Sequence, residues 1–97
     1  MTAFDLIALG DNCIDRLTVA VTADLVGGNA VNVAVQTAML GLSTAYCGAV
    51  GPTGEADADR VLAALTAKGV DVALVDRRAL ATSVTCLNVA ADGNRTI

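Results

Sequence analysis

The sequence contains no histidine and no tryptophan, and its three cysteines, Cys13, Cys47 and Cys86, lie far apart. Without histidine, the chain cannot build a catalytic triad or dyad that uses an imidazole base. An odd number of cysteines with no Cys-x-x-Cys pair also disfavours a zinc site or a disulfide framework, so no metal site is expected. Three small buried thiols in a reducing cytosol are the simplest interpretation.

Basic residues are few as well. Six Lys and Arg stand against ten Asp and Glu, the formal net charge is −4, and no basic run exceeds the pair Arg77–Arg78. Nucleic acid and anionic membranes bind concentrated positive patches, so neither partner is expected. The first ten residues carry Asp5 and no leading Lys or Arg, unlike a secretory signal, and we therefore expect a cytoplasmic protein.

One stretch, residues 25–54, carries no charge and has to be considered as a membrane span. Asn29, Asn32 and Gln36 interrupt its first half, and glycines with the only proline interrupt its second half. A spanning helix needs about 20 predominantly apolar residues. A buried helix followed by a buried strand therefore explains this stretch better than a span.

Aromatic residues are nearly missing, with one Phe and one Tyr, whereas the 97 residues include 19 Ala and 13 Val. A core of such small side chains suits helices that pack closely on a sheet. The length fits one domain, and a domain of this size buries only a little over ~60% of its unfolded surface. We therefore expect a single α/β unit with little stability in reserve.

The first half of the chain predicts a strand, a flap and a helix. Residues 4–9 are a mostly apolar run closed by a Gly-Asp-Asn turn, as in a central strand that reaches the edge of a sheet. Residues 13–26 mix β-branched and charged side chains without a helical period, which indicates short irregular strands or a flap. Asn29–Leu40 has helical length, and Gly41 is its expected C-terminal stop.

The second half continues the alternation of strands and helices. It predicts, in chain order, a strand at 43–50, a helix from 55 to 68 ended by Gly69, a short strand at 70–75, a strand at 82–91 and a hairpin turn at 92–94. Such alternation is typical of parallel strands joined by right-handed crossovers. We expect 4–9 and 43–50 to be parallel neighbours, with helix 29–40 crossing between them.

Ligands of open α/β sheets bind beyond the carboxyl ends of the parallel strands. The end of the first strand and the start of the first helix should meet at this edge. They bring together the candidate substrate-binding residues Asp11, Asp15, Gly27, Gly28, Asn29 and Asn32. Carboxylates accept hydrogen bonds, carboxamides donate and accept them, and the glycines expose backbone amides. This combination favours a ligand with several hydroxyl groups, such as a sugar or another polyol.

Each of these residues also has a plain structural interpretation. Asp15 alone could be an ordinary surface carboxylate, and Gly27–Gly28 could be a tight entry turn with Asn29 as the N-cap of the helix. Asn29, Asn32 and Gln36 share one side of the helix and could simply face water. Both interpretations stay open for these positions.

Phosphate-binding motifs are absent. The chain has no Gly-x-x-x-x-Gly-Lys-Ser/Thr loop, and no Gly-x-Gly-x-x-Gly follows the first strand. The Gly10-Asp11-Asn12 turn lacks the second and third glycines that let a pyrophosphate approach the backbone. A Rossmann-like nucleotide-binding fragment is therefore a weaker alternative.

The run GGNAVNVA at residues 27–34, with the glycines that follow at 41, 48, 51 and 54, resembles the N-terminal signature of the ribokinase-like (pfkB) carbohydrate kinases. The opening GDNCID at residues 10–15, the brief flap and the run GGNAVNVAV are most similar to the fructoselysine 6-kinase branch. The resemblance extends to the hairpin DGNRT at 92–96 and covers nearly the whole chain.

This resemblance implies a ribokinase-like α/β fold and an ATP-dependent transfer of a phosphoryl group to a sugar hydroxyl, with Mg²⁺ as the accompanying metal. Asp15 matches the family carboxylate that binds sugar hydroxyls, and Gly28, Asn29 and Asn32 match its glycine and polar helix positions. Many relatives have Lys where this chain has Asn29. Residues 13–26 and 82–97 correspond to a small β lid over the sugar.

The family's Gly-Ala-Gly-Asp motif, with its catalytic aspartate, belongs to a C-terminal half that these 97 residues do not include. The resemblance therefore implies that residues 1–97 are the N-terminal part of the fold, with no catalytic residue, with ATP and Mg²⁺ bound mainly elsewhere, and with no useful activity alone. A homodimer through the lid or a sheet edge is a further expectation. The alternative from another class is a non-catalytic sugar-binding or assembly module.

Overall fold

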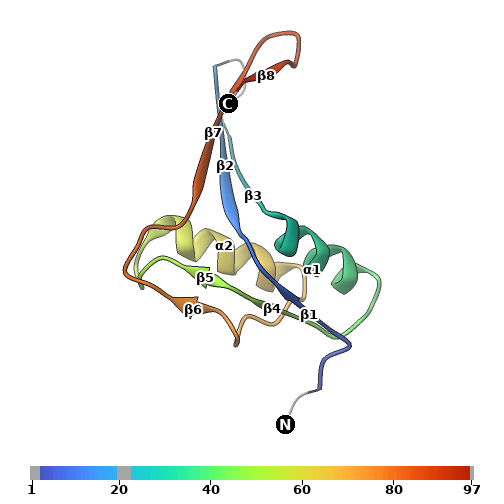
Figure 1. Cartoon of the computed structure of the whole chain (residues 1–97). Helices are drawn as coiled ribbons and strands as arrows, with labels where there is room; N and C mark the ends of the chain where they lie inside the picture. The colour runs from blue at the N-terminus through green and yellow to red at the C-terminus, as the bar shows by residue number, and fades with distance from the viewer. Residues whose placement is uncertain (1–2, 20–22, 97) are drawn as a thin grey trace.

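The computed structural model describes residues 3–19 and 23–96 (Figure 1). In these residues the secondary structure runs β1 (Leu6–Leu9), β2 (Cys13–Val19), β3 (Ala23–Gly27), α1 (Asn29–Met39), β4 (Thr44–Cys47), β5 (Ala49–Val50), α2 (Ala56–Ala67), β6 (Asp76–Arg77), β7 (Val84–Val89) and β8 (Arg95–Thr96). Residues 20–22 of the first expected lid segment, and Ile97 at the end of the second, lie outside the described residues.

Strands β1 and β4 are parallel neighbours, as predicted, in a register that pairs Leu6 with Thr44. Helix α1 connects them through β2 and β3 and packs against both strands. It forms because Val31, Ala34 and Thr37 recur at helical spacing and are buried against the strands. The helix ends at Met39, and Gly41 follows it with a φ of 89°, a backbone conformation typical of a glycine stop.

The strand expected at 43–50 is divided in two at Gly48. The hydroxyl of Tyr46 lies against the Cα of Gly48, so that a side chain at position 48 would collide with the phenol ring. Strand β4 therefore pairs with β1, while β5 pairs with β6 through Ala49 and Asp76. The run at 43–50 thus forms two strands and not the single strand expected.

The prediction of a strand at 70–75 is wrong. A single parallel bridge joins Asp71 to Ala45 of β4, and the chain then turns. The Asp71 carboxylate accepts a hydrogen bond from the Ala73 amide at 2.8 Å, and the Val75 amide donates to the Val72 carbonyl at 3.1 Å. This aspartate turn competes with the strand ladder, so the strand forms later, in what the sequence indicated to be a polar connection.

One core lies between the two helices and the parallel strands (Figure 1). Helix α2 contributes Ala58, Val61 and Leu65, all fully buried, and the strands contribute Ala8 and Tyr46. The small side chains let the layers approach closely, as the composition predicted. The two helices have 11 and 12 residues, and no helix in the described ranges is long and apolar enough to cross a bilayer.

The lid is a four-stranded sheet in the order β3-β2-β7-β8. Strand β2 is antiparallel to β3 and parallel to β7, and β8 returns from the Asp92–Asn94 turn, where Gly93 has a φ of 89°. The first lid segment thus contains two regular antiparallel strands, β2 and β3, rather than the short irregular strands or flap expected. Figure 1 shows these strands rising away from the helices and the parallel strands. The fold is α/β, as predicted, with a small β lid.

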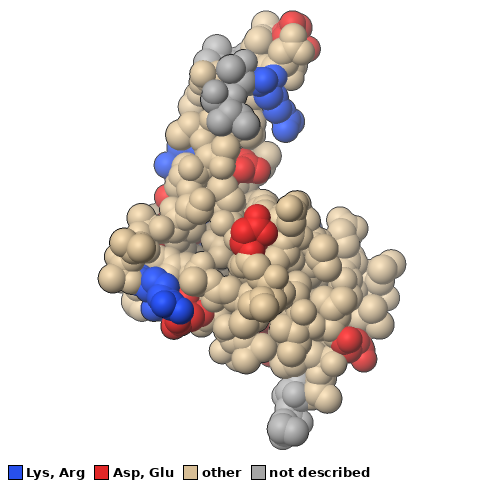
Figure 2. Space-filling model, viewed as in Figure 1, with Lys and Arg blue, Asp and Glu red and all other residues tan. Residues whose placement is uncertain are grey.

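The face displayed in Figure 2 carries scattered charged side chains and no extended patch of one sign. Several apolar side chains are nevertheless exposed on β1, where Ile7 and Leu9 retain 52% and 76% of their accessible surface. Among the described residues, β1 pairs on one side only, with β4. The parallel part of the fold therefore has an open edge next to apolar side chains.

Candidate functional site

Asp11 joins the end of β1 to the start of α1. Its two carboxylate oxygens accept hydrogen bonds from the backbone amides of Asn29 and Ala30, each at 3.2 Å. These amides hold the pKa of Asp11 below its ordinary value. The N-cap residue, Gly28, has no side chain that could accept hydrogen bonds from these amides. The carboxylate of Asp11, which is distant in sequence, accepts them instead.

Gly28 has to be glycine for two reasons. Its φ of 111° is a conformation that side-chain-bearing residues rarely adopt. A Cβ atom at this position would also stand 2.7 Å from the Asp11 carbonyl oxygen and 2.9 Å from the Asn12 Cα. The close contact at Gly28 is therefore with the chain's own backbone and holds the first turn of α1 against the end of β1.

Asp15 lies beside Gly27 at the base of the lid. In the β2–β3 hairpin, Cys13 pairs with Gly27 and Asp15 with Leu25. A Cβ atom on Gly27 would stand 2.9 Å from an oxygen of the Asp15 carboxylate, so the missing side chain leaves room for that carboxylate. Asp15 is half-buried, and no group in the described residues hydrogen-bonds to its side chain. Its oxygens are free to accept hydrogen bonds from a ligand.

The polar residues of α1 border two different hollows. Asn29 lines a cavity of about 290 Å³ with Asp11 and Val33, at the junction just described. Asn32 lines a separate groove of about 520 Å³ between β3 and the two helices, together with Gln36. The structure thus gathers Asp11, Gly27, Gly28, Asn29 and Asp15 around one junction. It places Asn32 one helical turn away, on the side of α1 that faces α2.

A third cavity, of about 340 Å³, opens at the carboxyl ends of β1, β5 and β6. The sequence did not single out the residues that line it beyond the first strand: Ala49, Val50, Arg78, Leu80, Ala81, Thr82 and Ser83. These residues lie in or after β5 and β6, which the sequence analysis predicted as part of one longer strand or placed at the wrong residues. Parallel strands bind ligands at this edge, so the cavity extends the candidate site.

Asn12 lines this cavity and hydrogen-bonds to the buried Tyr46. The Asn12 amide donates to the Tyr46 hydroxyl at 2.9 Å and to the Ala49 carbonyl at 2.7 Å. The Tyr46 hydroxyl in turn donates to the Gly10 carbonyl at 2.6 Å. Burial raises the pKa of Tyr46, which keeps the phenol neutral and able to donate. These two side chains bind the strand ends to one another and are not available to a ligand.

Glu55 and Thr82 fix the start of the second lid segment. The Thr82 amide donates to the Glu55 carboxylate at 3.1 Å, and the Thr82 hydroxyl accepts from the Gly51 amide at 2.9 Å. Hydrogen bonds from Thr82 lower the pKa of Glu55. From the sequence, position 55 was only the expected start of a helix. The structure shows it holding the chain that leads into β7.

Comparison with known protein families identifies the family to which the chain belongs. Residues 5–97 match the pfkB family carbohydrate kinases, and the chain belongs to that family. No curated protein matches the chain in sequence. The family is the one that the glycine-rich run at residues 27–34 indicated, whereas nothing found in the comparisons singles out the fructoselysine 6-kinase branch.

Solved structures of sugar kinases have the same fold. A PfkB protein from Polaromonas sp. JS666 is 23% identical, with a TM-score of 0.83, and the match covers 97% of this chain and 35% of that one. Fructokinase from Vibrio cholerae O395 is 24% identical, with a TM-score of 0.81 and coverages of 98% and 33%. Fructokinase from Xylella fastidiosa with bound ATP is 26% identical, with a TM-score of 0.77 and coverages of 94% and 28%. The chain spans about a third of the length of these kinases.

In residues 3–19 and 23–96, no group of three or more His, Cys, Asp or Glu side chains is arranged to hold a metal ion. The carboxylates nearest the parallel strand ends are already engaged, Asp11 with the amides of α1 and Glu55 with Thr82.

Proposed function

We propose that residues 1–97 form the N-terminal, sugar-binding part of a cytoplasmic carbohydrate kinase that phosphorylates a sugar hydroxyl with ATP. The observation that carries the proposal is the Asp15 carboxylate, which lies beside Gly27 at the base of the lid and has no hydrogen-bond partner within residues 3–19 and 23–96. Family membership and the ATP-bound fructokinase with the same fold support ATP as the donor. The three cysteines are free thiols, which are typical of a reducing compartment, but the expectation that all three are buried is wrong, since Cys86 is exposed and Cys13 and Cys47 are half-buried.

Asp15 is the residue that would orient the sugar. A carboxylate accepts hydrogen bonds from two neighbouring hydroxyls, which recognises a polyol and fixes its rotation. Asn29, exposed on the first turn of α1, would donate and accept on the other side of the same junction. Asn32, in the adjacent groove, would reach only a larger ligand. The lid strands would exclude water from the bound sugar.

We propose a ketohexose, or a ketohexose joined to an amine such as fructoselysine, as the substrate class. Fructokinases among the structures with the same fold support the first, and the likeness of residues 10–15 to the fructoselysine 6-kinase branch supports the second. We further propose that the protein forms a homodimer through its lid or open sheet edge. Two features support an association of this kind: Ile7 and Leu9 of β1 are exposed, and one edge of β1 pairs with no strand in the described residues.

An ADP-release assay on the protein expressed from its own gene tests this function. We expect ADP release that depends on a ketohexose or a fructosamine, and none with ATP alone. Saturable sugar binding without ADP release would instead support the non-catalytic sugar-binding module. The absence of both binding and turnover across hexoses, pentoses and fructosamines would overturn the proposal. Light scattering on the same sample measures the oligomeric state.

A further inference from the structure

Four charged side chains join the lid to helix α2. Arg16 on β2 contacts Asp24 on β3 at 3.0 Å and Asp57 on α2 at 2.9 Å. Arg60 on α2 contacts the same two carboxylates, each at 3.0 Å. The four groups form a closed ring of alternating charge, in which every carboxylate lies between two guanidinium groups. We call Arg16, Asp24, Asp57 and Arg60 the charge ring.

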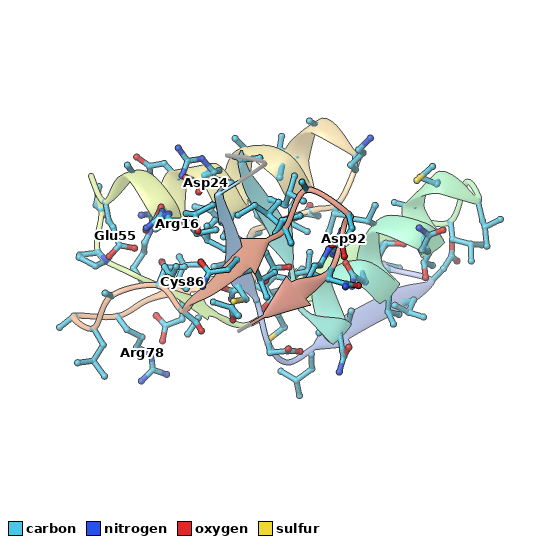
Figure 3. The ribbon with its side chains drawn as sticks, turned by 90° about the horizontal axis from the view of Figure 1, so that it is seen from above. Arg16, Asp24, Glu55, Arg78, Cys86 and Asp92 are labelled. Atoms are coloured by element: carbon cyan, nitrogen blue, oxygen red, sulfur yellow. The ribbon has the colours of Figure 1, made fainter. Side chains whose placement is uncertain are left out.

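The charge ring is more than a set of isolated surface pairs. Its side chains retain between 23% and 42% of their accessible surface, so each is partly shielded from water. Arg16 makes two hydrogen bonds to Asp24, through Nε and Nη2. Figure 3 shows Arg16 and Asp24 next to each other. Isolated exposed pairs contribute little to stability, whereas networks with bidentate arginine contribute more.

The charge ring acts on the strand that carries Asp15. Arg16 is its neighbour in sequence, and successive residues of a strand point to opposite faces of the sheet. Arg16 points to α2, so Asp15 points to the other face of the lid. Any rotation of β2 about its axis that released Arg16 from Asp57 would also turn Asp15 away from Gly27. The orientation of one side chain fixes the orientation of the other.

We propose that the charge ring locks the β2–β3 hairpin against α2 and thereby positions Asp15 for the sugar. Arg16, Asp24, Asp57 and Arg60 are then positioning residues, because they act through the strand and touch no ligand. The effect on sugar affinity rests on the proposed function. The effect on the lid does not, because it follows from the contacts of the charge ring alone.

The matched pair Asp57→Asn and Asp59→Asn tests the lock on the protein expressed from its own gene. Both aspartates lie in the first turn of α2 and both form an ion pair, but Asp59 pairs with Arg77, which lies outside the lid. We expect amide hydrogen exchange of β2 and β3 to become about fivefold faster in Asp57→Asn and to stay unchanged in Asp59→Asn. Asp57→Glu should restore slow exchange, and 1 M NaCl should speed exchange in the parent protein.

Sugar affinity is measured on the same variants by calorimetry with fructose and a fructosamine. We expect the Kd of Asp57→Asn to rise about fivefold and that of Asp59→Asn to stay at the parent value. Equal lid exchange in the two variants would overturn the lock. Faster lid exchange with an unchanged Kd would overturn the positioning of Asp15. A parent protein that binds neither sugar would refute the proposed function, and hydrogen exchange would still decide whether the lock exists.

Discussion

Asp11 and Gly28 define the junction between β1 and α1 together. The carboxylate supplies the hydrogen bonds that the capping glycine cannot, and the glycine admits the backbone turn that brings the helix amides to the carboxylate. Neither residue explains the junction alone. Asp11 was predicted to bind substrate, and that remains a prediction, but its two hydrogen bonds to α1 give it a structural role in any case.

Asp11→Asn should make the stability of the protein fall less steeply as the pH is lowered. The helix amides lower the pKa of the folded Asp11 below its model-peptide value of 3.8, so its ionised form stabilises the fold above that pH. This contribution is lost as the pH falls through the lower, folded pKa. Melting temperatures from pH 7 down to pH 2.5 should show the variant less stable at pH 7 and the two proteins converging in acid. A constant difference at every pH would contradict the assignment.

Gly28→Ala should destabilise the fold far more than Gly54→Ala. Both glycines have positive φ, 111° and 91°, but a Cβ atom at position 54 meets nothing within 4 Å, whereas at 28 it meets the backbone of Asp11. Gly54→Ala therefore measures the cost of the backbone conformation alone. Urea unfolding should show Gly28→Ala losing about 2 kcal/mol more than Gly54→Ala. Equal losses would mean that the backbone relaxes and that the contact is unimportant.

Among the elements, strands β1, β4 and β5 are joined by three polar groups: the Asn12 side chain, the Tyr46 hydroxyl and the Gly10 carbonyl. We call these groups the polar triad. Tyr46 is fully buried, and its hydroxyl lies between the Asn12 amide and the Gly10 carbonyl. The single tyrosine of the chain gave no functional signal, because a lone aromatic residue in an apolar run is typical of a core. Its role depends on the register of two strands distant in sequence, which no local pattern reveals.

Tyr46→Phe should weaken this joint without changing the fold. The substitution keeps the ring and leaves the Gly10 carbonyl without its buried partner, which costs about 1–3 kcal/mol. Chemical unfolding followed by circular dichroism measures the loss, and an unchanged spectrum of the folded variant shows that the helices persist. A loss below about 0.5 kcal/mol would show that water replaces the hydroxyl and that the triad contributes little.

The elements that the sequence predicted well are those with a strong local period. The strand at 4–9, the helices and the 92–94 turn match β1, α1, α2 and the β7–β8 hairpin closely. The failures lie where a tertiary or side-chain contact decides. The expected strand at 43–50 is interrupted at Gly48, where the Tyr46 ring packs against the backbone. After residue 70, the Asp71 side chain stabilises a turn, and the next strand begins only at Asp76. The cavity lined by Thr82 and Arg78 was missed because it depends on those strand ends.

At the scale of the whole molecule, the parallel strands and the lid are separate sheets connected by a few specific contacts. The charge ring joins the β2–β3 hairpin to α2, and Glu55 joins α2 to the chain entering β7. The candidate site lies where the lid and the parallel strands meet, so its shape depends on these contacts. Family membership was predictable from the glycine-rich run at 27–34, whereas the contacts that orient the lid were not.

Whether Asp15 binds the sugar can be decided by a titration with and without its carboxylate. Calorimetry with fructose and a fructosamine is done on the parent protein, expressed from its own gene, and on its Asp15→Asn variant. We expect saturable sugar binding to the parent and at least about tenfold weaker binding to the variant, because the variant loses a charge-assisted hydrogen bond to the sugar. Equal affinity in the two proteins, with both folded, would contradict the account.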